Sequence, residues 1–156
     1  MAVIFTNAAV IISTCSQAAA LGSSYDISTV VTQVDINRTY DIHDKTVMGQ
    51  TSHAVVTGLE KWKATVTVLQ TFSTADEKGI NVDQLIAKLV DIGSSGSSFT
   101  IAIRPSNAAR SCSNPEYTGP VILSAYDPMK GKVGDLLVTA LPFESAGNIS
   151  RFVSSS

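Results

Sequence analysis

The chain has 156 residues, a length typical of one domain with a substantial core, and its 44% of hydrophobic and only 15% of charged residues indicate a weakly charged surface rich in Ser and Thr. Such a surface suits either a protein that other copies of itself largely cover or a β-rich domain with a neutral exterior. The 13 acidic and 11 basic residues are interspersed, with a net charge of -2, so no basic stripe is present and sequence-specific nucleic-acid binding is disfavoured.

The N-terminal residues predict an extended arm. Residues 2–12, AVIFTNAAVII, read as β-like, and we assign about residues 1–25 to an N-terminal arm of one domain that spans residues 1–156. The apolar, Ala-rich stretch is reminiscent of a signal peptide, but no Lys or Arg precedes Asp26. We therefore expect no export signal. No apolar run approaches the roughly 18 residues of a membrane-spanning helix.

Two alternating segments predict a long hairpin. Apolar and polar residues alternate from Val30 to Tyr40, and residues 61–72, KWKATVTVLQTF, repeat the alternation more strongly around Trp62. These segments are expected to pair as antiparallel strands. The charged residues 41–53 between them then form an extended hairpin loop that projects from the domain.

One helix is predicted at about residues 82–92. Asn81 can cap its start, Gln84 stands where a capping box has Glu or Gln, and Gly93 can close its end. The apolar stripe is expected to cover one face of a sheet. It consists of Val82, Leu85, Ile86, Leu89 and Val90.

Three further strands are predicted, at residues 99–105, 119–126 and 136–144. Pro142 implies an edge position or a bulge in the last of them. Both faces of this strand are apolar, which predicts burial on both sides, either by the helix or by a neighbouring subunit.

Motifs of catalysis and of metal or cofactor binding are absent from the sequence. It contains no G-x-S-x-G elbow, no Walker loop and no H-E-x-x-H. His43 and His53 lie ten residues apart without a third nitrogen or sulfur ligand nearby, so we interpret them as exposed loop histidines and not as metal ligands. Cys15 and Cys112 are too few for a disulfide framework or a zinc site, and we expect two reduced thiols, with a single disulfide as the alternative. No cofactor and no enzymatic activity are predicted.

The order of these pieces resembles the major tail tube proteins of long-tailed, siphovirus-type bacteriophages. The similar segments are the N-terminal apolar arm, DISTVVTQVDINRTYD at 26–41 and DKTVMGQTSHAVVTGLEKWKATVTVLQTF at 44–72, which contains the family's Thr-x-x-Gly and then Gly-Leu before a long strand. After the short helix follow FTIAIRPS, NPEYTGPVILSAYDP, GKVGDLLVTALPF and a closing GNISR. Together these segments span roughly residues 3–151, and their order and spacing carry the resemblance.

The resemblance implies a mainly β fold, a β-sandwich or open barrel of the phage tail-tube type with one flanking helix. It implies that six copies close into a ring by joining their inner sheets, and that stacked rings form the conduit for DNA ejection. The implied partners are other copies, the tape-measure protein, the tail terminator and initiator proteins, and viral DNA in non-specific transit, without a membrane. The implied location is the virion tail, after assembly in the bacterial host cytoplasm.

The same resemblance gives the hairpin segment the role of an arm that reaches an adjacent subunit or ring. The N-terminal arm and the apolar strand at 136–144 are further interface candidates, although a core strand beneath the helix would explain the latter equally well. The candidate interface residues are Asp41, His43, Asp44, Lys45, Met48, Gly49, His53, Leu137, Leu141 and Phe143.

Two other functional classes stay open on the sequence. A secreted β-sandwich binding or adhesin module would explain the Ser and Thr content, but 6% of aromatic residues and a single Trp equip it poorly for a sugar platform. A small hydrolase on a β fold would need a nucleophile with a base, and the sequence shows no such pair.

Overall fold

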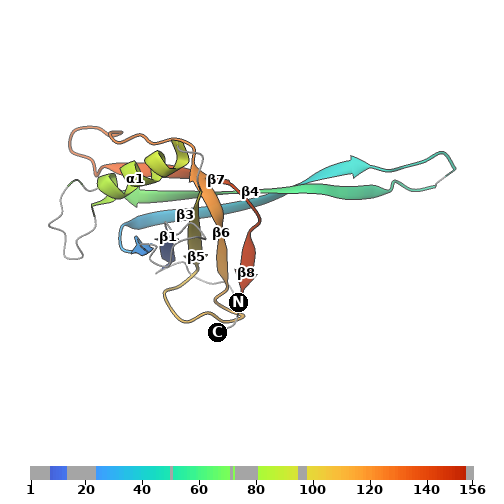
Figure 1. Ribbon diagram of the computed structural model, residues 1–156, viewed down its shortest axis with the longest axis horizontal. Helices are drawn as coiled ribbons and strands as arrows, with labels where there is room; N and C mark the ends of the chain where they lie inside the picture. The colour runs from blue at the N-terminus through green and yellow to red at the C-terminus, as the bar shows by residue number, and fades with distance from the viewer. Residues whose placement is uncertain are drawn as a thin grey trace.

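The computed structural model describes residues 8–13, 24–49, 51–70, 72, 81–94 and 98–153. Its helix, α1, is Val82–Ser94. The strands are β1 (Ala9–Ser13), β2 (Ser24–Asp26), β3 (Val31–Asp44), β4 (Val55–Leu69), β5 (Phe99–Arg104), β6 (Glu116–Leu123), β7 (Val138–Ser145) and β8 (Ser150–Phe152). The predicted fold class, mainly β with one helix, is confirmed (Figure 1).

All strand pairs are antiparallel and belong to one open sheet in the order β2-β1-β5-β6-β7-β4-β3, with β8 paired to β6 beside this path. A short turn connects β2 and β3, the two strands at the ends of this order. Ile27 N donates to Val10 O, and Val30 O accepts from Leu69 N, so residues 27–30 lead directly from the β1–β2 ladder to the β3–β4 ladder. The sheet therefore curls on itself as an open barrel does.

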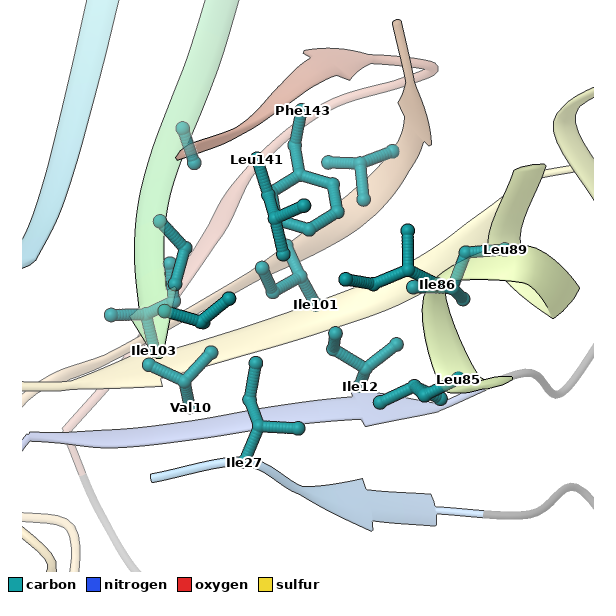
Figure 2. Packing of buried hydrophobic residues seen from close by; sticks show 14 of the residues in the cluster. Val10, Ile12, Ile27, Leu85, Ile86, Leu89, Ile101, Ile103, Leu141 and Phe143 are labelled. Atoms are coloured by element: carbon teal, nitrogen blue, oxygen red, sulfur yellow. The ribbon is translucent and has the colours of Figure 1, made fainter. Parts of the chain in front are cut away.

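The core fills the inside of this curled sheet. Figure 2 shows apolar side chains from the N-terminal strands, from β5 and β7 and from α1 meeting in one cluster. Phe99 and Phe143 pack edge to face with ring centroids 5.8 Å apart, a favourable aromatic geometry. Burial of these side chains is the main contribution that holds the helix on the sheet.

The helix follows its predicted pattern with two differences. Asn81 Oδ1 accepts a hydrogen bond from Gln84 N at 3.1 Å, which confirms the N-cap. The helix passes through Gly93 and ends at Ser94. Val90, expected on the buried stripe, is 39% exposed, whereas the other four predicted stripe residues, Val82, Leu85, Ile86 and Leu89, are buried.

The described part of the predicted N-terminal arm is a sheet strand. β1 lies between β2 and β5, and Val10 and Ile12 are fully buried. Residues 1–7 and 14–23 of the predicted arm lie outside the described residues. Residues 9–13 thus belong to the core of the domain.

Pro142 differs from its prediction, because β7 is an interior strand between β6 and β4. The Pro142 carbonyl accepts from Ser124 N at 3.1 Å, on the side of β6. In an antiparallel strand a residue's N–H and C=O face the same side, so the missing N–H of Pro142 also faces β6, one residue beyond its end at Leu123. At Pro142 β7 therefore has no β6 strand beside it, as at the edge of a sheet. The missing N–H of the proline removes no hydrogen bond to β4.

Candidate functional site

The hairpin of β3 and β4 extends far beyond the rest of the sheet. β7 pairs with β4 between Lys63 and Leu69, and in the described part of the chain the segment of β4 before Lys63 forms strand pairs with β3 alone. Figure 1 shows this part leaving the body as a long, narrow projection. We call residues 39–61 the arm. At about 3.3 Å per residue, its strands reach roughly 20 Å from the body before the turn begins.

The predicted loop at residues 41–53 is shorter than expected. The β3–β4 ladder continues through Ile42↔Thr57 and His43↔Val56 to Asp44↔Val55, so residues 41–44 are strand and the turn covers 45–54. None of these residues is buried, so pairing with the backbone of β4 keeps them in strand conformation. The sequence pattern gave no alternation here, and for that reason predicted a loop.

A cluster around Arg38 holds the two strands together where the arm leaves the body. Arg38 Nε donates to Glu60 Oε1 at 2.6 Å, and Arg38 Nη2 donates to Tyr40 Oη at 3.0 Å. The guanidinium also lies 5.9 Å from the centre of the Tyr40 ring. The hydrogen bond to Glu60 raises the pKa of Arg38 above its ordinary value. These contacts link the two strands at the base of the arm.

A β-bulge follows this cluster in the arm. Between the pairs Tyr40↔Glu60 and Ile42↔Thr57, β4 has one residue more than β3. A Cβ on Gly58, inside the bulge, would lie 2.8 Å from His43 Nε2, so the imidazole occupies the space beside the glycine. Gly58 permits this close approach of His43 because it has no side chain.

The turn at the tip of the arm has defined hydrogen bonds. Lys45 N donates to Ala54 O at 2.7 Å, and Asp44 Oδ1 accepts from Thr46 N at 2.8 Å. Hydrogen bonds from the Thr46 hydroxyl and backbone lower the pKa of Asp44. His53 Nδ1 lies 3.5 Å from Asp44 Oδ2. Gly49 has a φ of 98°, a conformation that L residues with side chains rarely adopt.

Apolar side chains on the arm point into water. Met48 at the tip and Leu59 near the bulge are 105% and 80% exposed. Clustered exposed apolar residues mark interaction surfaces, and a projecting hairpin offers them to a partner from several sides. The exposed apolar residues of the arm are Tyr40, Ile42, Val47, Met48, Val55, Val56 and Leu59.

The candidate interface residues of the sequence fall into two groups in the structure. The seven from Asp41 to His53 all lie on the arm and are exposed. Leu141 and Phe143, in contrast, are 1% and 0% exposed inside the core, and Leu137 is half-buried with its carbonyl bonded to Gln70 N. We therefore remove the buried Leu141 and Phe143 from the candidate site and keep the seven arm residues, whereas Leu137, which is only half-buried, stays a prediction.

The sequence reading missed the apolar members of the arm other than Met48. The signal was present in VVTGL at 55–59, where apolar residues occupy both faces of a strand. A strand that is apolar on both faces and lies outside the core has to be covered by another molecule. The missed residues are Tyr40, Ile42, Val47, Val55, Val56 and Leu59.

The described residues offer no site for metal chemistry. Among them, no three His, Cys, Asp or Glu side chains lie close enough together to hold a metal ion. Cys112 is an exposed free thiol, and Cys15 lies outside the described residues. Within the same residues, no helix is long and apolar enough to cross a membrane. The chemical character of the candidate site is that of an apolar contact surface with a few charges.

No protein-family model and no curated protein matches this chain. Solved structures do match. A chain in the tail of an empty gene transfer agent particle, determined with C6 symmetry, has a TM-score of 0.59 and 14% identity over 90% of this chain and 93% of that chain. The SPP1 tail tube has a TM-score of 0.64 and 7% identity over 96% of this chain and 78% of that chain.

The baseplate of the anti-feeding prophage, 6-fold symmetrised, matches with a TM-score of 0.57 and 7% identity over 97% of both chains. The chain has the fold of these tail structures. The fold that the sequence resemblance implied is therefore confirmed over nearly the whole chain.

Proposed function

We propose that this protein is a structural virion protein that self-assembles into hexameric rings, and that the stacked rings form a phage tail tube for DNA ejection. The observation that carries the proposal is the arm, which exposes a set of apolar side chains on a fold shared with tail assemblies. An isolated subunit gains nothing from holding such residues in water. Association with other copies buries them and lowers the free energy.

The edge of β3 supports the same proposal. β3 spans 14 residues, and in the described part of the chain it pairs with β4 alone. A long free edge is a template for pairing with another chain. Closing a ring of subunits satisfies such edges, whereas contacts along the ring axis repeat without a natural end and produce a tube.

The proposed setting follows from this role. The proposed partners are other copies, the tape-measure, terminator and initiator proteins, and DNA in transit without sequence recognition. The net charge of -2 suits a conduit, because a strongly basic wall would hold phosphates. The virion tail is the proposed location, after assembly in the cytoplasm of the bacterial host. No membrane and no enzymatic step is required.

The alternative function, a sugar-binding adhesin, would need an exposed aromatic residue such as Trp62 for stacking. Trp62 is 2% exposed and bonded through its indole N–H to Gly147 O, so it is not available as a stacking platform. No described feature favours that function over assembly.

The mass of the full-length chain in solution tests the proposal. Six copies of 16.4 kDa give a ring of about 98 kDa, and larger multiples of this mass are expected as rings stack. The measurement is light scattering after size exclusion over a wide range of concentrations. Monomers that persist at the highest concentrations would contradict the proposal, whereas monomers at low concentration alone fit a chain that waits for an initiator.

A further inference from the structure

An apolar cavity of about 180 Å³ lies inside the curled sheet, between β3 and the pair of β5 and β6. It is lined by Val34 and Ile36 of β3, Ile103 of β5, Pro105 directly after β5, and Tyr117 of β6. None of these five residues is charged. Ile103 is buried and the other four are half-buried, so the cavity is open to solvent on one side.

The cavity continues the core of the domain. Ile103 belongs to the core cluster, and Val34 and Ile36 pack against that cluster. Ile103 pairs with Val10 of β1 on one side and with Tyr117 on the other, so these three side chains form a row across the sheet. Figure 2 shows Val10 and Ile103 together at one end of the cluster. Beyond this row the core ends in the open cavity instead of in a covering side chain.

β1 leads the chain before it directly to the cavity. Ala9 pairs with Arg104, the residue before Pro105, so the chain that precedes Ala9 runs past this wall of the cavity. Residues 1–7, MAVIFTN, precede this point and lie outside the described residues. We call them the N-terminal segment. Four residues of chain between Phe5 and Ala9 span at most about 14 Å. This length is about three times the spacing of neighbouring strands, so Phe5 is within reach of the cavity.

The size and the chemistry of the cavity fit an aromatic ring. An apolar cavity of about 150 Å³ in a protein core accommodates benzene. The cavity of about 180 Å³ therefore has room for the side chain of Phe5, the aromatic residue of the N-terminal segment. Docking of this ring removes apolar surface from water on the ring and on the half-buried lining residues, and this burial is favourable.

Other segments outside the described residues fit the cavity less well. Residues 14–23 and 95–97 adjoin the opposite ends of β1 and β5, where Ser13 pairs with Thr100. Residues 73–80 lie between the end of β4 and the start of α1. Residues 154–156, after β8, are three serines without an apolar side chain. The N-terminal segment combines a starting point beside the cavity with apolar residues.

We propose that Phe5 docks in this cavity of its own chain and closes the open side of the core. The short connection to β1 holds Phe5 at a high effective concentration beside the cavity, which favours docking within the chain over docking from another copy. The inference does not depend on the proposed function. It gives part of the N-terminal arm, predicted from the sequence as an interface candidate, a role inside the subunit.

A disulfide within one chain tests the docking. In a chain with Cys15→Ser and Cys112→Ser, the pair Phe5→Cys and Val34→Cys is expected to form an intramolecular disulfide under mild oxidation, detected by mass spectrometry of the monomer. The matched control pairs Phe5→Cys with Asp35→Cys, because Asp35 is exposed on the opposite face of the same strand. The control is expected to give several-fold less product.

Two results of this experiment would overturn the docking. Equal yields for Val34→Cys and Asp35→Cys would show that Phe5 samples the surroundings of β3 without entering the cavity. Disulfides that join two chains, with none within a chain, would show that the occupant comes from a second copy. Both yields report on the subunit, so a failure of tube assembly would overturn the proposed function and leave the docking standing.

Thermal unfolding provides a second, independent readout. Phe5→Ser is expected to lower the midpoint of thermal unfolding by about 3–8 °C, because the buried ring is lost. Asn7→Ser, a change at a polar neighbour in the same segment, is expected to leave the midpoint unchanged. Val34→Ala combined with Phe5→Ser is expected to cost less than the sum of the two single changes, since the two residues share one contact. An unchanged midpoint for Phe5→Ser, or strict additivity, would contradict the docking.

Discussion

The indole of Trp62 occupies the space in which a side chain on Gly119 would stand: a Cβ placed there would lie 2.5 Å from Trp62 Cζ2. The indole Nε1 donates to Gly147 O at 2.7 Å. Trp62 is the first buried residue of β4 after the arm. Its contact therefore anchors the base of the arm to β6 and to the segment before β8. A rigid base lets contacts at the tip fix the position of the whole subunit.

Gly119→Ala is therefore expected to lower the free energy of unfolding by about 1–3 kcal/mol, since the added methyl group overpacks a closed site. Urea titration of the subunit measures the effect. Gly49→Asn is the matched control, because this glycine has no atom within 4 Å of its Cβ position and Asn tolerates positive φ. Equal stability of Gly119→Ala and the parent chain would show that Trp62 is free to move.

The tip of the arm can be removed without touching the core. Replacing residues 45–54 by Asn-Gly keeps Asp44 and Val55 paired and closes the hairpin with a two-residue turn. Cooperative unfolding is expected to persist, because all core residues remain, while tube formation is lost. Circular dichroism and electron microscopy report on the two properties. Tubes of normal length from this variant would refute the role of the tip in assembly.

Substitutions of Leu59 and of Leu141 distinguish an effect on assembly from an effect on the core. Leu59 is 80% exposed, so Leu59→Ser is expected to change the free energy of unfolding by no more than about 0.5 kcal/mol and to weaken assembly. Leu141 is 1% exposed, so Leu141→Ala is expected to cost about 2–5 kcal/mol by opening a cavity. Denaturant unfolding together with sedimentation distinguishes them. Normal assembly of Leu59→Ser would remove this residue from the interface.

Tyr126 predicts a loss of stability at alkaline pH. Burial, and then the hydrogen bond to Asp83, raise the pKa of Tyr126 from 10.0 to about 12. The folded chain therefore keeps this proton at a pH where the unfolded chain has released it, and stability falls as the pH rises from 10 through 12. In Tyr126→Phe this component is expected to disappear, as measured by urea unfolding across that range. An unchanged alkaline slope would show that other groups cause it.

Local patterns in the sequence predicted those elements whose residues alternate between core and water. The helix of residues 82–94 and the strands around Trp62 and Ile101 follow from such periodicity and are confirmed. The alternation around Thr32 is broken because a bulge there shifts the register, so Val31 and Val34 both pack against the core. A bulge depends on the partner strand, which a single segment does not reveal.

The remaining differences have the same origin, since they depend on where other strands end. Pro142 is tolerated in an interior strand because β6 stops at Leu123, a tertiary fact. Leu141 was predicted to be an interface residue because an apolar residue in a sequence does not reveal whether the core of its own chain or another subunit buries it. The arm was correctly placed between two strands; the apolar pattern at 55–59 was visible in the sequence, and the structure adds that no core covers these residues.

Negative-stain electron microscopy of the purified full-length chain at high concentration tests the central claim most directly. Self-assembly through the arm predicts hollow tubes or rings whose end views have six subunits. A field of compact monomers at every concentration, with no rings even after addition of preformed tail tips, would contradict it.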